Sequence, residues 1–309
     1  MPVNIAVVGS FVTDFIFRAP RRPVKGETVV GLGFDMAMGG KGANQAVMAA
    51  HLGARVSMIG RVGNDSFGDM QIKNMARAGV CTDYVVRDPD LGTGAGGIVV
   101  DAEGDNSIVF VPNANGKVCR EDIDAATPAI ESCDTLLVQL ELPFKVNGYA
   151  IKKAHKLGKR VILDPAPACI LEDYFYEYAS IMTPNETEAA ILTGVRVEDA
   201  DSAARAARII ADKGCETVIV TLGANGAYLL HQGRGERLPP VQVNAVDTTA
   251  AGDAFTGSLA VFLGEGLPMR EAARRAGIVG ALCATRTGAQ PSLPTRAQFE
   301  AFLAQTRES

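Results

Sequence analysis

Short apolar runs alternate with amphipathic stretches along most of this chain. The runs predict buried β-strands, and the stretches between them carry apolar residues at helical spacing. We expect strands at 5–9, 56–60, 135–140, 161–163, 181–183, 218–222 and 228–230, and helices at 43–52, 67–78, 146–157, 185–192, 202–213, 252–264 and 269–285. Repeated strand–helix–strand units are typical of a doubly wound, mostly parallel sheet flanked by helices, so the expected fold class is α/β.

Three β-rich segments interrupt this alternation and have no helix between neighbouring strands: residues 11–17, 28–38 and 97–111. We expect them to form a small antiparallel sheet, built from about 11–38 and 91–112. This sheet would cover the C-terminal edge of the main sheet as a lid, because open α/β sheets bind ligands at that edge. An extension of the main sheet is the alternative. No linker divides the chain, so a single domain over 1–309 is expected.

The composition is that of a folded protein with a large core. Of 309 residues, 47% are hydrophobic and 21% are charged, which excludes intrinsic disorder as the main state. The net charge is −5 and basic residues form no cluster, so no nucleic-acid partner is expected. No apolar run approaches the length of about 18 residues that a membrane span needs, so no membrane partner is expected. Six scattered cysteines without a C-x-x-C motif are typical of reduced thiols in a cytoplasmic protein.

Residues 92–97, Gly-Thr-Gly-Ala-Gly-Gly, fit the G-x-G-x-x-G pattern of dinucleotide-binding proteins. That pattern needs a strand before it and a helix after it. Here Asp88-Pro89-Asp90 precedes the glycines, and a strand-like segment follows them. We therefore interpret these residues as a flexible turn that leads into the lid.

The run Gly39-Gly40-Lys41-Gly42-Ala43-Asn44 opens a predicted helix. Glycines let a backbone approach a ligand closely, and the N-terminus of a helix presents free N–H groups. Lys41 and Asn44 add side-chain donors. The same run also fits a turn whose small residues only allow tight helix packing.

A second candidate site follows the β-like residues 241–246. Asp247 and Asp253 flank a Gly-containing turn, and Asp253 begins a long apolar helix. The N–H groups at this helix start predict an anion hole for a developing phosphoryl charge, and Asp253 would act as general base, a step typically worth about 10²–10⁴-fold. An isolated acid there would only complement the helix dipole, at about 0.3–1 kcal/mol. Together with the glycine-rich run upstream, the catalytic interpretation is favoured.

Both segments resemble signatures of one protein family. GGKGANQA, followed by GARVSMIGRVGNDSFG, and DTTAAGDAFTG are similar to the two signatures of the ribokinase (PfkB-type) carbohydrate kinase family. The motifs GETVVG, TPNETEA, VTLGANGA and TRTGAQPS match the family in the same order, so the resemblance extends from Gly9 to Ser292. It implies a ribokinase-like fold with a small β lid, and a homodimer formed through the lids.

The resemblance also implies a role for each matching residue. Asp253 would be the catalytic base, and the anion hole would be formed by the amides of Ala250, Ala251, Gly252 and Asp253. The sugar hydroxyls would contact Asp14, Gly40, Lys41, Asn44 and Glu141. ATP and Mg²⁺ would be held by Asn185, Glu188, Thr221, Gly223 and Gly226. An activating monovalent cation, expected to be K⁺, would lie among mainly backbone carbonyls of Asp247, Thr249, Cys283, Arg286, Gly288 and Ser292.

The activity implied by this resemblance is ATP-dependent phosphorylation of the primary, 5-hydroxyl of D-ribose. Val12 stands where many family members carry an asparagine that contacts the sugar, and an apolar side chain cannot replace that hydrogen bond. A kinase for another sugar, such as deoxyribose or a fructose-like sugar, or for a nucleoside is therefore an alternative. A non-catalytic sugar sensor is a further alternative, and the presence of Asp253 and Gly252 argues against it.

Overall fold

The computed structural model describes residues 2–305, and its centre is a nine-stranded sheet. The strands of this main sheet are β1 (Asn4–Val8), β4 (Arg55–Gly63), β5 (Val80–Asp88), β8 (Thr135–Val138), β9 (Arg160–Leu163), β10 (Ile181–Met182), β11 (Thr217–Thr221), β12 (Ala227–His231) and β13 (Arg234–Leu238). They lie in the order β13-β12-β11-β10-β9-β8-β1-β4-β5. All neighbours from β11 to β5 pair in parallel, and β12 and β13 add two antiparallel strands at one edge. The predicted doubly wound, mostly parallel sheet is confirmed.

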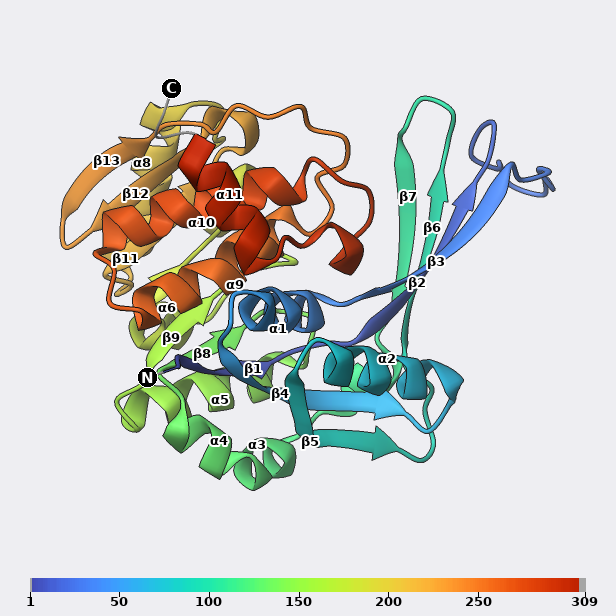
Figure 1. The fold of residues 1–309 in the computed structure, drawn as a ribbon, viewed down its shortest axis with the longest axis horizontal. Coiled ribbons are helices and arrows are strands. Elements are labelled where there is room, and N and C mark those ends of the chain that lie inside the picture. Colours follow the sequence, from blue (N-terminus) through green and yellow to red (C-terminus); the bar gives the residue numbers. More distant parts are fainter. Residues whose placement is uncertain (1, 306–309) are drawn as a thin grey trace.

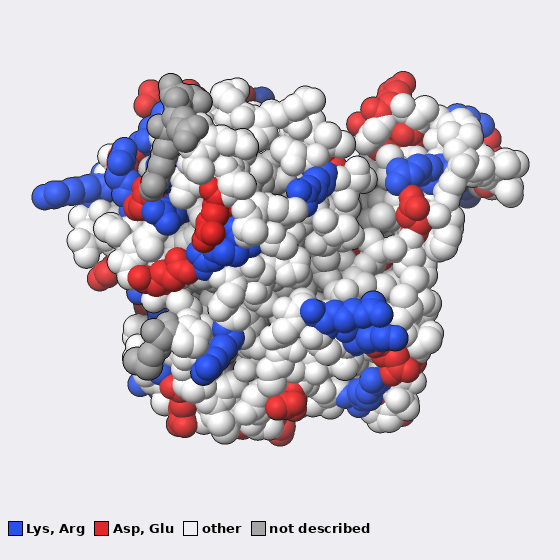
Figure 2. Space-filling view, viewed as in Figure 1, with Lys and Arg blue, Asp and Glu red and all other residues white. Residues whose placement is uncertain are grey.

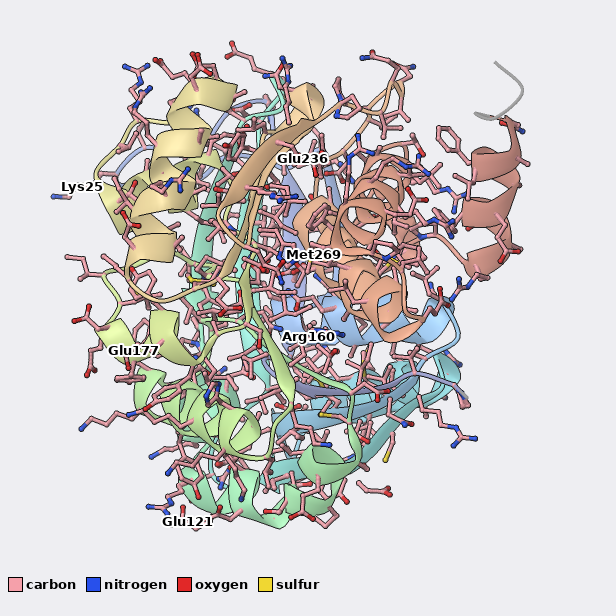
Figure 3. The ribbon with its side chains drawn as sticks, turned by 90° about the vertical axis from the view of Figure 1, so that its left-hand side faces the viewer. Lys25, Glu121, Arg160, Glu177, Glu236 and Met269 are labelled. Carbon is pink, nitrogen blue, oxygen red and sulfur yellow. The ribbon has the colours of Figure 1, made fainter. Side chains whose placement is uncertain are left out.

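Helices cover both faces of the main sheet (Figure 1, Figure 3). The core on one face includes side chains of α1 (Lys41–His51), α2 (Ser66–Arg77), α9 (Ala251–Gly264), α10 (Met269–Cys283) and α11 (Arg296–Gln305). The core on the other face includes side chains of α3 (Arg120–Ala125), α4 (Thr127–Ser132), α5 (Phe144–Lys156), α6 (Asp173–Tyr178), α7 (Glu186–Thr193) and α8 (Ala200–Asp212). Three short 3₁₀ turns, η1 (Asn113–Lys117), η2 (Gly223–Asn225) and η3 (Gln290–Ser292), connect the larger elements.

The central strands are mostly apolar because both faces of the main sheet are buried there. In β1, Ile5 and Val7 belong to the core beside α1 and α9, whereas Ala6 and Val8 belong to the opposite core, and all four are at most 1% exposed. This two-sided burial explains why the central strands could be located from apolar runs alone.

All seven expected strands and all seven expected helices are present, with ends that differ by a few residues. The pattern of hydrophobic positions did not predict β5, β13, α3, α4, α6 and α11, most of which are short or rich in polar residues. Residues 241–246 looked β-like but form no strand, and Val246 in this loop is 64% exposed. Alternation of apolar and polar residues does not by itself produce a strand where no edge of a neighbouring strand is available for pairing.

A separate lid sheet contains β2 (Val12–Arg18), β3 (Gly33–Gly39), β6 (Gly94–Val100) and β7 (Asn106–Val111), in the order β3-β2-β6-β7. It projects from the main body on the right of Figure 1. The expectation of a small lid sheet, rather than an extension of the main sheet, is confirmed. The outer pairs β2–β3 and β6–β7 are antiparallel, and the central pair β2–β6 is parallel. Residues 92–97 lead into β6 without a helix, so their dinucleotide-like pattern is indeed part of a turn and a strand.

Buried amide side chains hold the base of the lid sheet. Asn115, in η1 after β7, accepts a hydrogen bond from the Phe11 nitrogen at 3.0 Å and donates one to the Phe11 oxygen at 2.7 Å. Gln71 of α2 donates to the Val12 oxygen at 2.8 Å. These bonds fix the backbone at the point where β2 leaves the main body.

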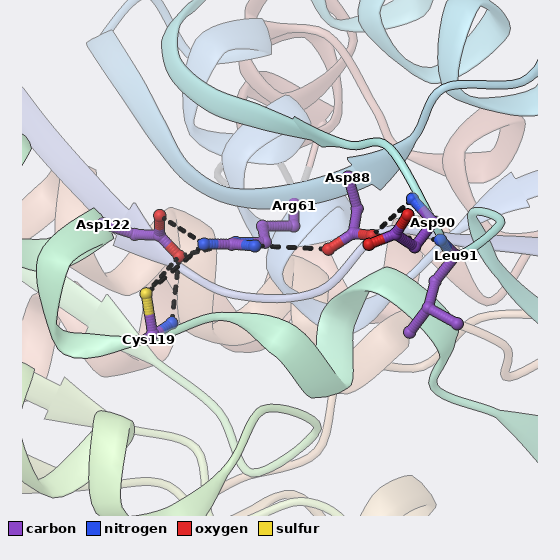
Figure 4. Close-up of polar contacts among 6 residues, drawn as sticks. All are labelled: Arg61, Asp88, Asp90, Leu91, Cys119 and Asp122. Atoms are coloured by element: carbon purple, nitrogen blue, oxygen red, sulfur yellow. Dashed lines mark hydrogen bonds and ion pairs between the residues drawn. The ribbon is translucent and has the colours of Figure 1, made fainter.

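Arg61, near the end of β4, connects three elements close to the lid sheet (Figure 4). Its guanidinium donates to Asp122 of α3 at 2.7 and 3.0 Å and to Asp88 of β5 at 3.2 Å. Asp88 in turn accepts from the backbone nitrogens of Asp90 and Leu91, in the turn that precedes β6. The network therefore joins the ends of β4 and β5 to α3 and shapes the approach to the lid sheet.

The surface carries mixed charge. On the face seen in Figure 2, lysine and arginine side chains lie among aspartates and glutamates without forming one continuous basic patch. Within residues 2–305, every helix is too short or too polar to span a membrane. All six cysteines are free thiols.

Candidate active site

A cleft of about 200 Å³ lies at the C-terminal ends of β9, β10 and β11, where α1 and α9 begin. This is the sheet edge at which open α/β folds bind ligands. Predicted site residues from four separate segments line it: Lys41, Asn185, Glu188, Thr221, Ala250, Gly252 and Asp253. The fold therefore brings the two glycine-rich segments of the sequence together at one place.

Asp253 lies in the first turn of α9 and is 5% exposed. Asn44 Nδ2 donates to its Oδ2 at 2.8 Å, and Gln45 Nε2 donates to its Oδ1 at 3.2 Å. Burial raises the pKa of Asp253, although the nearby Lys41 ammonium and the two amide donors oppose that rise. A carboxylate with a raised pKa is a stronger base than a fully solvated one, so Asp253 is suited to accept a proton.

The N-terminus of α9 opens into the same cleft. Ala250 precedes the helix in the left-handed conformation (φ 62°), which is uncommon for a residue with a Cβ, and no side chain among the described residues caps the helix. Gly252 is exposed, and a Cβ at this position would meet no other atom within 4 Å. First-turn amides have no partner within their own helix, so those of Gly252 and Asp253 can bind an anion in the cleft.

Lys41 begins α1 beside four carboxyl groups. Burial by itself would lower the pKa of its ammonium group, but the charges of Asp253, Asp164, Glu141 and Glu188 raise it above its ordinary value. Burial also raises the pKa of Asp164 and of Glu188. Lys41 therefore stays protonated and offsets part of the negative charge that these carboxyl groups concentrate around the cleft.

Asp14 lies on β2 between two glycines of the neighbouring strands. A Cβ at Gly39 would fall 2.5 Å from Asp14 Oδ2, and a Cβ at Gly96 would fall 2.2 Å from Asp14 Oδ1. Burial, together with the charge of Glu141, raises the pKa of Asp14 to about 6. The two glycines therefore provide the space that this partly buried carboxyl group occupies.

Glu141, Gly40 and Asn44 complete the predicted sugar-binding set. A Glu141 oxygen accepts from the Ser10 hydroxyl and from the Lys41 backbone nitrogen, the latter at 2.9 Å. Gly40 has φ 96°, and a Cβ there would fall 2.6 Å from the Ser10 oxygen, so a larger residue does not fit. Asn44 Oδ1 is buried and has no hydrogen-bond partner among the described residues. A substrate hydroxyl could satisfy this acceptor.

Asn185 and Glu188 form the capping box of α7. Asn185 Oδ1 accepts from the Glu188 nitrogen at 2.9 Å, and Glu188 Oε2 accepts from the Asn185 nitrogen at 2.8 Å. Both residues also line the cleft, so the capping role and a ligand-binding role are compatible. The pair is thus held rigidly at the start of α7.

The predicted nucleotide residues Thr221, Gly223 and Gly226 follow one another at the end of β11. Thr221 lines the cleft, and the two glycines lie just beyond it, in and after η2. Gly226 has φ 88°, and a Cβ there would fall 2.2 Å from the Leu238 oxygen, so the turn requires glycine.

Asp247 joins two loops close to the start of α9. Its Oδ1 accepts from the Thr249 nitrogen and hydroxyl at 2.9 and 2.6 Å, and its Oδ2 accepts from the Gly288 nitrogen at 2.8 Å. Burial would raise the pKa of Asp247, but these hydrogen bonds lower it below its ordinary value. Residues expected around a monovalent cation therefore do lie together, although they are far apart in the sequence.

The remaining predicted cation-site residues differ in their surroundings. The Cys283 sulfur lies 2.9 Å from Ser292 Oγ, and both residues are buried. The Arg286 side chain is exposed and donates to Gln298 at 3.3 Å. Only its backbone could belong to a cation site.

Sequence reasoning assigned no role to three residues that the fold places at the site. Asp164, directly after β9, lines the cleft and is buried. Gln45 and Ser10 reach the side chains of Asp253 and Glu141, respectively. An acidic residue directly after a buried strand was the one local signal that could have identified Asp164.

Known proteins resemble this chain along its whole length. The model of the pfkB family of carbohydrate kinases matches residues 3–296. A ribokinase from Haemophilus influenzae is 41% identical over 303 residues, which cover 98% of this chain and 99% of that protein. A deoxyribokinase from Salmonella typhi is 38% identical, covering 97% and 99%. The solved structure of an Arabidopsis thaliana ribokinase complexed with ribose and ATP has a TM-score of 0.91 at 32% identity, covering 98% of this chain and 99% of that chain.

A hydroxyl-activating carboxylate at an anion-binding helix end is the arrangement expected of a phosphotransferase with an alcohol acceptor. The fold around it is that of the ribokinases with which it superposes. Since the family match covers nearly all residues, the chain belongs to the pfkB family of carbohydrate kinases. It is a sugar kinase.

Proposed function

We propose that this enzyme transfers the γ-phosphoryl group of ATP to the 5-hydroxyl of D-ribose. The observation that carries the proposal is the position of Asp253, a buried carboxylate in the first turn of α9, beside Lys41 and open helix amides. Similarity to ribokinases at up to 41% identity supports ribose as the acceptor. This function makes no use of a nucleophilic side chain, because phosphoryl transfer needs mainly positioning and charge stabilisation.

Asp253 accepts the proton of the 5-hydroxyl as the hydroxyl oxygen forms its bond to the γ-phosphorus. The bond between that phosphorus and the bridging oxygen of ATP breaks, and its electron pair stays with ADP. The amides of Ala250, Gly252 and Asp253 stabilise the negative charge on the transferring group. The Ala251 amide was also predicted to do so, but it donates to the Thr248 oxygen at 3.1 Å. Lys41 adds a positive charge at the same place.

The sugar is held by groups that retain some hydrogen-bonding capacity unused within the protein. Asn44 Oδ1 is buried without a partner, and Asp14 lies partly buried on the lid sheet. We assign Asp14, Gly40, Lys41, Asn44 and Glu141 to the sugar hydroxyls. A buried polar atom that stays unpaired costs about 1–3 kcal/mol, so these atoms favour a ligand rich in hydroxyl groups.

Asn185, Glu188, Thr221, Gly223 and Gly226 are assigned to ATP and Mg²⁺. Within residues 2–305, no three acidic, histidine or cysteine side chains cluster into a complete metal cage. A site of this kind suits Mg²⁺, which keeps waters and nucleotide phosphates among its ligands. Glu188 would hold the metal with the phosphates, and the bound metal would neutralise phosphate charge.

We assign an activating K⁺ to the backbone carbonyls of the loops that Asp247 joins. The fit rests on loops rich in carbonyl oxygens, held together by Asp247 beside the start of α9. Replacing KCl by tetramethylammonium chloride at constant ionic strength should lower kcat several-fold, and Asp247→Ala should raise the KCl concentration for half-activation. A shift in the melting temperature with KCl in the wild type, absent in Asp247→Ala, is the second readout. Equal rates in both salts would contradict the assignment.

The first test measures ADP release from Mg²⁺-ATP with D-ribose, deoxyribose, fructose and nucleosides, with and without K⁺. We expect ribose to give the highest kcat/KM. Asp253→Asn should lower kcat by about 10²–10⁴-fold while leaving the melting temperature and ATP binding unchanged. Full activity of Asp253→Asn would show that another group is the base. Sugar binding without ADP release by the wild type would instead indicate a sensor.

Deoxyribose is the second candidate acceptor, and Val12 favours it. Val12 is 4% exposed and lies on the same face of β2 as Asp14, two residues away. An apolar side chain beside the sugar suits a carbon that lacks a hydroxyl group. If deoxyribose is the better substrate, Val12→Asn should shift the ratio of kcat/KM toward ribose. An unchanged ratio would remove Val12 from the specificity determinants.

We further propose a cytoplasmic homodimer formed through the lid sheets. The free thiols support a reducing compartment.

Ile108 and Val109 of β7 are 60% and 68% exposed and point to opposite faces of the lid sheet, which leaves apolar surface on both. Sedimentation of the wild type should give a dimer. Ile108→Glu and Val109→Glu, compared with each other, show which face is buried, and a monomeric wild type would contradict the proposal.

A further inference from the structure

We propose that Gln45 is a positioning residue that holds Asp253 in its proton-accepting orientation and links it to Asp164. The proposal rests on the function proposed above, in which Asp253 is the base. It adds a residue that touches no substrate, since Gln45 is completely buried.

The evidence begins with the two hydrogen bonds made by one amide nitrogen. Gln45 Nε2 lies 2.8 Å from Asp164 Oδ2 and 3.2 Å from Asp253 Oδ1. An amide NH₂ group has two hydrogens, so it can donate to both carboxylates at once. Asn44 Nδ2 donates to the other oxygen of Asp253. Both oxygens of the base are therefore oriented by neighbouring residues of α1.

The orientation of the Gln45 amide is itself fixed. Gln139 Nε2 donates to Gln45 Oε1 at 2.6 Å. Because carboxylates only accept, Gln45 must point its NH₂ group toward Asp253 and Asp164, and its oxygen must face Gln139. Gln139 Oε1 is consequently left buried without a hydrogen-bond partner among the described residues. A buried acceptor without a partner lowers the free energy of unfolding. The orientation of the Gln139 and Gln45 amides is therefore kept at the expense of stability.

Close contact between α1 and α9 is what lets Gln45 reach the base. Gly257 lies one turn after Asp253, and a Cβ there would fall 2.7 Å from the Gln45 backbone oxygen and 3.1 Å from Met48 Cβ. A side chain at 257 would force the two helices apart. Gly257 therefore sets the spacing at which the Gln45 amide can bridge the two carboxylates.

This geometry predicts a specific kinetic effect. Gln45→Met keeps the size of the side chain but removes both hydrogen bonds to the carboxylates. We expect kcat to fall by about 10-fold or more while the KM values for sugar and ATP stay within about 3-fold, because only the transition-state role of Asp253 is affected. Gln45→Glu, which keeps the shape but places an acceptor opposite two carboxylates, should lower kcat at least as much.

The decisive measurement repeats the change in an Asp253→Asn background. If Gln45 acts through Asp253, adding Gln45→Met should change the residual kcat by less than about 3-fold. Asn147→Leu is the matched control, because Asn147 of α5 is equally buried and donates to the Leu142 oxygen. It should lower the melting temperature and leave kcat unchanged.

Each outcome decides the matter. Wild-type kcat in Gln45→Met, or an equal loss of kcat with and without Asp253, overturns the positioning role. If Gln45→Met does not fold, Gln45→Glu supplies the same test with the volume preserved. A fully active Asp253→Asn would instead overturn the proposed base, which keeps the two failures distinguishable.

Discussion

Asn44 donates a 2.8 Å hydrogen bond to Asp253, and this contact joins the first turn of α1 to the first turn of α9. The donor belongs to one glycine-rich segment of the sequence and the acceptor belongs to the other. The same amide keeps its oxygen free for a ligand. In the proposed function, this one side chain would both orient the base and bind the sugar.

Asn44→Ala should consequently affect both kinetic constants. Loss of the bond to Asp253 should lower kcat by about 10-fold or more, and loss of the free oxygen should raise the sugar KM by a similar factor. Initial rates over a grid of sugar and ATP concentrations measure both. A change in KM alone would mean that the contact with Asp253 has no role in turnover. The contrast with Gln45, whose variants should alter kcat only, is part of the prediction.

Gly96→Ala should weaken sugar binding, because the added methyl group would fall 2.2 Å from the Asp14 carboxylate and displace it. We expect the sugar KM to rise by about 10-fold or more with the ATP KM unchanged. Gly97→Ala is the matched control on the same strand, since a Cβ there would come no closer than 4.0 Å to its nearest neighbour. Equal effects at both positions would point to a general disturbance of β6.

Sugar binding should weaken in acid. Burial raises the pKa of Asp14 from 3.8 to about 6, so this group is protonated below about pH 6 in the sugar-free enzyme. A protonated carboxyl loses acceptor capacity, and the dissociation constant of the sugar should therefore rise as pH falls through about 6. Isothermal titration with the sugar across pH 5 to about 8 measures this directly. A pH-independent affinity in that range would exclude Asp14 from the sugar site.

The raised pKa of Asp14 also affects the stability of the fold, which should be greater in acid, whereas sugar binding should be weaker there. Because the folded protein binds this proton more tightly than the unfolded chain, Asp14 destabilises the fold as pH rises from about 3.8 to about 6. Asp14→Asn removes that penalty. At pH 8 the variant should be more stable than the wild type by on the order of 1 kcal/mol, since one pKa unit corresponds to about 1.4 kcal/mol and the group is partly solvated. Urea denaturation of both proteins checks the sign.

Arg61→Met should destabilise the protein, because the variant leaves Asp122 buried without its bidentate partner. We expect the free energy of unfolding to fall by about 2 kcal/mol or more. Arg87→Met is the control, since the Arg87–Asp69 pair is 39% and 71% exposed and should contribute less than about 1 kcal/mol. Equal losses in the two variants would argue against a special role for the network in Figure 4.

The central strands, the main helices and the lid sheet were predictable because their signals are local. In β1 every side chain after Asn4 is buried, and the apolar run shows it directly. Gln45 gave no such signal, and Asp164 offered only its place directly after the buried strand β9. The hydrogen bonds of Gln45 to Asp164 and to Asp253 span 119 and 208 residues, so they depend on how α1 packs against the end of β9 and against α9. The β-like pattern of residues 241–246 did not correspond to a strand. A local pattern contains no information on whether a partner strand lies beside it.

The parallel pairing of β2 with β6 has a consequence for how such lids could be exchanged between kinases. Two segments of the chain, 12–39 and 94–111, leave the main body separately as two excursions. The pairing of β2 with β6 joins them into one sheet. Each excursion on its own forms only a two-stranded antiparallel pair, β2 with β3 and β6 with β7. Exchanging only one of these two segments between kinases would pair β2 or β6 with a strand of a different sequence. The two segments therefore have to be exchanged together, although they are separate in the gene.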